Sequence, residues 1–178
     1  MTTATKTMKP TTAIKPHIVT RDFSAPRDLV WKVCTEAEHM VKWLSPEGMN
    51  AFYKTMEFRA GGVFHYGQRS DDGSMTLWGK ITYTEISPKD RLVFLQSFSD
   101  EDGGMGSHPM APGWPKVMYA TNEFTDLANG GTRMTVTWVP VEGSSTDELA
   151  MFDGARAGMD GGWKGTLDKL EGYLNVAK

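Results

Sequence analysis

The chain has 178 residues, and this length favours one domain with a sizeable core over two domains. Its hydrophobic fraction of 39% and aromatic fraction of 11% argue against general disorder, because they supply enough apolar surface to form a core. The net charge is -3 and no basic block occurs, which argues against nucleic acid and anionic membranes as partners.

Two more features concern the compartment and the ends of the chain. The single cysteine, Cys34, excludes an internal disulfide and suits a reducing compartment. No apolar run matches a signal peptide or the ~20 residues needed to cross a bilayer. We therefore expect a cytoplasmic protein without membrane contact, with a disordered tail over residues 1–15 and one domain over residues 16–178.

The first expected elements are a strand and two short helices. Residues 17–24 alternate loosely and predict a strand. Residues 26–34 begin with a proline, which suits a helix start, and then show an apolar stripe. Thr35 and Glu38 have the spacing of a capping box, so a second helix is predicted over residues 35–43.

A period of two then replaces the helical period. It predicts six strands with tight turns between most of them, near residues 51–59, 62–69, 74–85, 91–98, 115–125 and 132–139. Short consecutive strands of this kind favour an antiparallel meander. Residues 99–114 are too long and too rich in Gly and Pro for a hairpin turn, so we expect a mobile loop that acts as a lid.

A helix is predicted over residues 146–175, with Thr146 as its N-cap. Five glycines interrupt its first half: Gly154, Gly158, Gly161, Gly162 and Gly165. Each costs about 1 kcal/mol relative to Ala, so we expect a weak or kinked helix before Trp163. Either the glycines let the helix pack closely on a curved sheet, or they make a flexible pocket wall.

Several short motifs follow one another in a familiar order along residues 17–175. They are Phe23–Pro26 with Val30-Trp31, Trp43–Gly48, Arg59–Phe64, Gly79–Ile81, Glu85–Phe94, Gly131–Val136, and Gly162-Trp163 with Leu167, Leu170 and Leu174. In these motifs the chain resembles the SRPBCC (START-like, Bet v 1-like) superfamily. Within it, the chain is similar to the group named after the C-terminal domain of the activator of Hsp90 ATPase.

The resemblance implies an α+β helix-grip fold. In this fold a curved antiparallel sheet surrounds a long C-terminal helix, two short helices follow the first strand, and a cavity lies between sheet and helix. The eukaryotic co-chaperone also has a separate N-terminal Hsp90-binding domain, for which we expect no counterpart in this sequence.

Metal and nucleotide cofactors are not expected. The four histidines, His17, His39, His65 and His108, lie far apart and lack ligand spacing among themselves or with Cys34. No phosphate-binding loop or dinucleotide-binding fingerprint is present.

The candidate ligand-binding residues are aromatic, methionine and polar side chains of the strands and the last helix. A strand pattern leaves open whether His65, Gln96 and Tyr119 face solvent or the cavity. Trp31 is assigned to the core. The predicted cavity residues are Trp43, His65, Trp78, Phe94, Gln96, Tyr119, Trp138, Met159 and Trp163.

Three functions fit this sequence. The first is a protein, monomeric or homodimeric, that binds a small hydrophobic molecule. The second is a cyclase- or dehydratase-like enzyme, in the manner of the polyketide cyclases of the superfamily, with His65, Tyr119 or Glu123 moving protons. The third is a co-chaperone-type interaction domain, which predicts an exposed apolar patch and no sizeable cavity.

Overall fold

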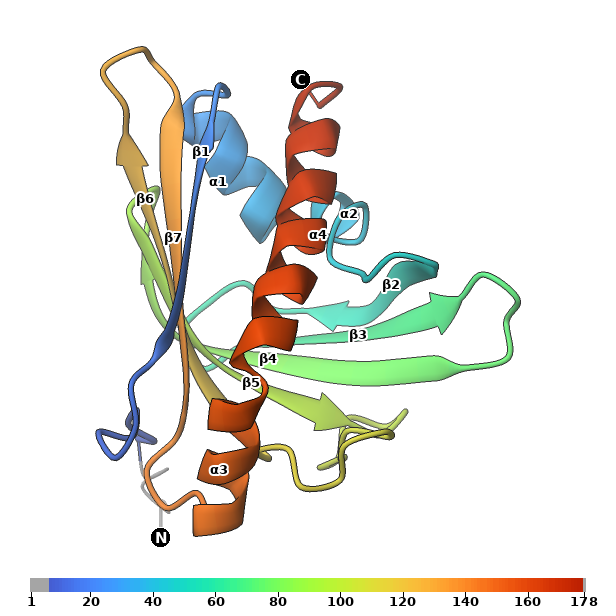
Figure 1. The fold of residues 1–178 in the computed structure, drawn as a ribbon. Coiled ribbons are helices and arrows are strands. Elements are labelled where there is room, and N and C mark those ends of the chain that lie inside the picture. Colours follow the sequence, from blue (N-terminus) through green and yellow to red (C-terminus); the bar gives the residue numbers. More distant parts are fainter. Residues whose placement is uncertain (1–6, 178) are drawn as a thin grey trace, which may run out of the picture.

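The computed structural model describes residues 7–177, and in it a curved sheet wraps around a long C-terminal helix (Figure 1). In chain order the elements are β1 (His17–Phe23), α1 (Arg27–Thr35), α2 (Ala37–Met40), β2 (Met49–Met56), β3 (Val63–Ser70), β4 (Thr76–Ser87), β5 (Arg91–Ser99), β6 (Met118–Asp126), β7 (Thr132–Pro140), α3 (Thr146–Gly154) and α4 (Arg156–Leu174). This arrangement confirms the predicted helix-grip fold.

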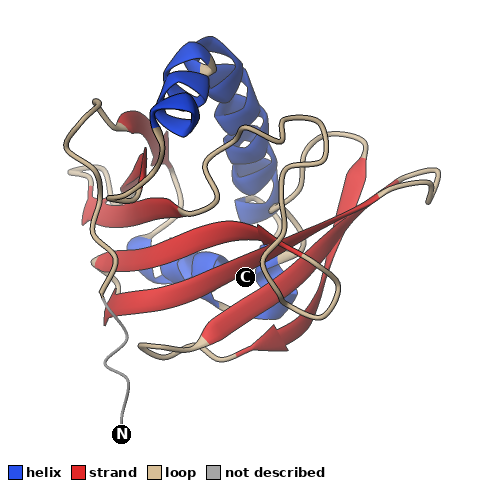
Figure 2. Ribbon diagram, turned by 90° about the horizontal axis from the view of Figure 1, so that it is seen from below, coloured by secondary structure: helices blue, strands red, loops and turns tan. Residues whose placement is uncertain are grey.

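Within the described residues the sheet has seven strands in the order β1-β7-β6-β5-β4-β3-β2, and every neighbouring pair is antiparallel. Figure 2 shows the helices gathered on one side of the sheet. Alternate residues of each strand therefore face the helices on the concave side or point away on the convex side. On β5, Phe94 and Gln96 face the concave side, and Leu95 between them faces the convex side.

The core fills the end of the concave side where the second half of α4 lies. Leu167 and Leu170 of α4 are fully buried there against Val30 of α1 and aromatic side chains of the sheet. Arg21 of β1 adds ion pairs to Asp168, at 2.8 Å, and to Glu171, at 2.9 Å, on α4. The first half of α4 lies outside this packed core, next to a part of the concave side that the core does not fill.

The short helices differ from the sequence prediction at their ends. The second helix spans only Ala37–Met40, and Glu36 is its N-cap. The Thr35 hydroxyl donates instead to the carbonyl of Trp31 within α1, at 2.8 Å, so the expected capping box does not form. Local spacing did not reveal this competing backbone acceptor.

The C-terminal helical region is divided in two. Ser145, and not Thr146, caps α3, in a capping box with Glu148. The break between α3 and α4 is at Ala155, within the glycine-rich stretch.

The interpretation that the five glycines allow close packing on the sheet is wrong. A Cβ added at Gly154, Gly158, Gly161, Gly162 or Gly165 would meet no heavy atom within 4 Å.

Residues 9–15, expected to belong to a disordered tail, contact the domain. Pro10 bridges to Val141 just after β7, and the Glu142 N–H donates to the carbonyl of Lys9 at 2.8 Å. Ile14 packs on a second small cluster of buried side chains that includes Met118 and Phe152. Residues 1–6 of the expected tail lie outside the described residues.

Candidate functional site

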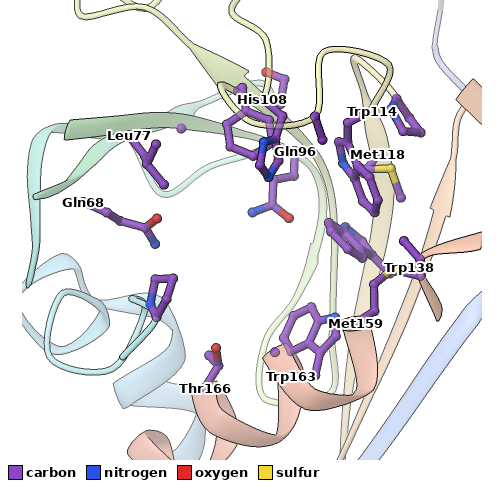
Figure 3. A pocket seen from close by; sticks show the side chains of 18 of the residues that line it. Gln68, Leu77, Gln96, His108, Trp114, Met118, Trp138, Met159, Trp163 and Thr166 are labelled. Atoms are coloured by element: carbon purple, nitrogen blue, oxygen red, sulfur yellow. The ribbon is translucent and has the colours of Figure 1, made fainter. Parts of the chain in front are cut away.

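A pocket of about 550 Å³ lies between the concave face of the sheet, the helices α3 and α4, and the segment 99–114 (Figure 3). Strands β3, β4 and β5 form its floor, and α4 closes one side through Met159, Gly162, Trp163 and Thr166. The core occupies the other end of the same concave face. The pocket is thus the part of the helix-grip interior that side chains leave unfilled.

An almost continuous row of aromatic rings forms one wall of the pocket. It begins with Phe98 and His108, whose ring centroids lie 4.9 Å apart, and continues from His108 to Trp114 over 6.4 Å. Trp114 then lies 5.8 Å from Trp138, which lies 5.9 Å from Trp163 in an edge-to-face contact. Such a wall offers large apolar surfaces and ring edges to a flat ligand.

Small residues at the start of α4 form another part of the pocket wall, beside Trp163. Ala155, Gly158, Gly162 and Thr166 follow at steps of three or four residues, so they share one face of the helix, and all four line the pocket. Since a Cβ at Gly158 or Gly162 would meet nothing, these glycines enlarge the pocket. The sequence marked them as unusual but did not show which helix face they occupy.

Two glutamine amides reach into the pocket from the sheet (Figure 3). Gln68 Nε2 on β3 donates to the carbonyl of Leu44 at 2.5 Å. Gln96 Nε2 on β5 donates to the Tyr66 hydroxyl at 3.1 Å. Burial raises the pKa of Tyr66, so that its hydroxyl stays neutral at physiological pH.

His108 is the titratable residue of the pocket wall with a lowered pKa, and burial is the cause. Its Nδ1 accepts the backbone N–H of Met110 at 3.1 Å, which places the proton of the neutral ring on Nε2. No Asp, Glu, Lys or Arg is among the described residues that line the pocket. The pocket is therefore electrically neutral at pH 7.

The turn at Leu44–Pro46 completes the pocket and is held by a lysine. Lys169 Nζ on α4 donates to the Ser45 carbonyl at 3.0 Å, the Ser45 hydroxyl at 3.1 Å and the Pro46 carbonyl at 3.1 Å. The Ser45 hydroxyl donates in turn to the carbonyl of Met49 at 2.9 Å, so its proton points away from the lysine. The Ser–Lys contact therefore fixes the turn.

The structure brings together four of the predicted site residues, Gln96, Trp138, Met159 and Trp163, on the wall of the pocket. Trp78 also borders the pocket. Its indole ring, however, packs against Phe52 and His65, each at a centroid distance of 5.3 Å, on the convex side.

The other four predicted residues do not line the pocket. Trp43 is buried in the core and its indole N–H donates to the carbonyl of Val33, at 3.1 Å. Phe94 faces the concave side but belongs to the same core. His65 and Tyr119 point to the convex side, because their strand neighbours face the helices.

Glu123 shares the convex face with Tyr119, so the three proton-transfer residues considered for a cyclase lie outside the pocket. Four further residues line the pocket and were not predicted from the sequence: Tyr66, Gln68, His108 and Trp114. Tyr66 and Gln68 alternate with His65 on β3, and only the pleat direction, set by helix packing, distinguishes the two faces.

Within residues 7–177, no three His, Cys, Asp or Glu side chains gather as a metal ion would require. In the same part of the chain, no helix combines the length and the apolar character needed to cross a membrane.

A family model described as Activator of Hsp90 ATPase homolog 1-like protein matches residues 24–175. No curated protein matches the chain in sequence.

Solved structures with a similar fold come from several bacteria. A protein from Arthrobacter aurescens is 24% identical, with a TM-score of 0.75 over 96% of this chain and 92% of that one. A protein from Mycobacterium smegmatis is 22% identical, with a TM-score of 0.73 over 94% of both chains. The AHSA1 protein from Silicibacter pomeroyi is 15% identical, with a TM-score of 0.68 over 90% of this chain and 98% of that one. At such identities the likeness concerns the fold alone.

Proposed function

The chain belongs to the family of Activator of Hsp90 ATPase homolog 1-like proteins, and from this premise we propose that it binds a small, uncharged, largely apolar molecule in the pocket beside α4. The observation that carries the proposal is a pocket of about 550 Å³ with an aromatic wall and no charged lining residue. A pocket of this size and character suits a small molecule.

The apolar wall supplies the binding free energy in this proposal. A ligand that buries ~300 Å² of apolar surface at ~25 cal/mol per Å² gains about 8 kcal/mol before the entropy of association is subtracted. That value corresponds to a micromolar Kd, or a weaker one once association is counted. Edge-to-face contacts with Trp138 and Trp163 would favour a flat, aromatic body.

The neutral lining restricts the charge of the ligand. A carboxylate or ammonium group on the ligand would lose its hydration in the pocket and would find no opposite charge among the lining residues. Desolvation of such an unpaired charge is strongly unfavourable. His108 does not change this, because burial favours its neutral form.

A large side chain introduced on α4 would fill the pocket and so tests the proposal. Gly162→Leu puts a large side chain into the pocket, and Gly161→Leu puts the same side chain beside it on a part of α4 that does not line the pocket. We expect isothermal titration calorimetry with 2-naphthol to show binding to the wild type and to Gly161→Leu, and at least tenfold weaker binding to Gly162→Leu. Equal affinity in all three proteins would place the binding elsewhere.

The interaction-domain function is the alternative outcome of this experiment. If wild-type protein binds no apolar probe, and native mass spectrometry finds no co-purified small molecule, the pocket has no ligand role. A protein partner would then account better for the family relationship.

A further inference from the structure

The two glutamines of the pocket differ in what they offer to a ligand. We infer that Gln68 Oε1 is a fixed hydrogen-bond acceptor, so that the pocket selects uncharged ligands carrying an O–H or N–H group over equally apolar ligands without one. This inference rests on the proposed function and names the chemical class of ligand that the same pocket would take.

Gln68 has only one workable amide orientation. Its partner, the carbonyl oxygen of Leu44, can only accept, so the NH₂ group must be the end that contacts it, at 2.5 Å. The other end of the amide, Oε1, is then an acceptor. Within residues 7–177 no group donates a hydrogen bond to it, and Figure 3 shows the Gln68 amide pointing into the pocket.

Gln96 is adaptable where Gln68 is fixed. Its partner is the Tyr66 hydroxyl, 3.1 Å away, which can either accept from Nε2 or donate to Oε1. A turn of the Gln96 amide therefore exchanges an acceptor for a donor on the pocket side and keeps the contact with Tyr66. Gln96 accommodates ligands of either kind and contributes little discrimination between them.

The selection follows from what a ligand does to Gln68 Oε1 on entry. A ligand without a donor removes this oxygen from solvent and leaves it unpaired, whereas a ligand with a donor restores the hydrogen bond. A carboxylate fails on both counts, because it brings a charge without a counter-charge and places oxygen against oxygen.

Three probes with the same naphthalene body separate these effects: 2-naphthol with a donor, 2-methoxynaphthalene with only an acceptor, and 2-naphthoate with a charge. By titration calorimetry at pH 7.5 we expect the wild type to bind 2-naphthol about tenfold more tightly than 2-methoxynaphthalene, which is about 1.4 kcal/mol. We expect no measurable binding of 2-naphthoate.

Two matched variants assign the preference to its residue. Gln68→Met keeps the length of the side chain and removes the acceptor together with the penalty for leaving it unpaired. 2-Methoxynaphthalene should therefore bind about tenfold more tightly than it binds the wild type, and the preference for 2-naphthol should vanish. Gln96→Met should retain the preference. Measurable binding of 2-methoxynaphthalene shows that each variant is folded with an open pocket. Tyr119→Phe on the convex face, outside the pocket, serves as the control that should keep the wild-type affinities.

The outcomes distinguish this inference from the proposed function. If no probe binds to the wild type, the proposed function itself fails. If 2-naphthol and 2-methoxynaphthalene bind equally well, the pocket binds ligands but does not select for a donor, and the inference is overturned. A preference that survives Gln68→Met and disappears in Gln96→Met likewise overturns the assignment to Gln68.

Discussion

The position of Tyr66 depends on the absence of a side chain at Gly79 of the neighbouring strand. The Tyr66 ring lies across Gly79, and a Cβ there would be 2.4 Å from the ring carbon Cζ and 2.5 Å from the hydroxyl oxygen. Tyr66 stacks on Phe64 with centroids 5.1 Å apart and holds Gln96 by its hydroxyl. One missing Cβ thus sets the depth of the pocket floor.

Gly79→Ala should therefore displace the Tyr66 ring and lower the free energy of unfolding by about 1–3 kcal/mol, as is usual for overpacked sites. Urea denaturation measures the change. Gly165→Ala is the matched control, because a Cβ at that exposed helical position meets no atom, and it should raise stability by up to about 1 kcal/mol. Equal effects of the two substitutions would contradict the described packing.

His108 gives probe binding a pH dependence with a defined sign. Burial lowers its pKa from the usual 6.5, so the ring is neutral above that pH and gains a proton only as the pH falls through the lowered value. The unfolded chain binds this proton more readily, so the contribution of His108 to stability is present above pH 6.5 and is lost below it.

A bound apolar ligand desolvates the ring further. The affinity for 2-naphthol should therefore be constant from about pH 7 to about pH 8. It should fall as the pH drops toward about 5, because the ring then gains a proton. Titration calorimetry across this range measures the effect. His108→Gln should flatten the profile, and a profile that is equally steep in this variant would assign the titration to another group.

Among the elements, the segment 99–114 has two halves of different character. Residues 99–106 are held on the convex face, where His65, Lys54 and Lys80 donate hydrogen bonds to the carbonyls of Asp100, Glu101 and Gly103. Residues 107–114 make turns and supply His108 and Trp114 to the pocket wall. His65 therefore anchors the segment from the side opposite the pocket.

The lid role predicted from Gly and Pro content stays a prediction, and it applies best to the second half. Hydrogen exchange should be faster across residues 107–114 than across residues 100–106. Lys80→Met removes the hydrogen bond to Gly103 and should speed exchange in the first half, with little effect on the exchange of β6. Uniform exchange across the whole segment would argue against two halves.

In the whole molecule, the sheet and α4 are packed tightly at one end and separated by the pocket at the other. A ligand that binds only the folded state stabilises it by an amount that grows with the logarithm of its concentration over Kd, which is about 2.7 kcal/mol at one hundred times Kd. In thermal unfolding, saturating 2-naphthol should raise the Tm of the wild type. The Tm of Gly162→Leu should rise less at the same ligand concentration, and an equal rise in that variant would show binding outside the pocket.

The sequence by itself determined the order of the elements. Period-two alternation and turn residues predict strands from local information, and spaced leucines such as Leu167 and Leu170 predict the packed half of α4. The high Trp content of the sequence also predicts a pocket role for Trp163, and this residue lines the pocket from α4.

Only the tertiary structure decided which face of each strand and helix meets the pocket. His65 and Gln68 lie three residues apart on β3 and are both polar, yet they point to opposite sides because a strand alternates at every residue. Gly161 and Gly162 are identical neighbours, and only the second lines the pocket. The side that becomes interior is fixed by where α4 packs, through contacts between residues far apart in the chain, which no local pattern of the sequence contains.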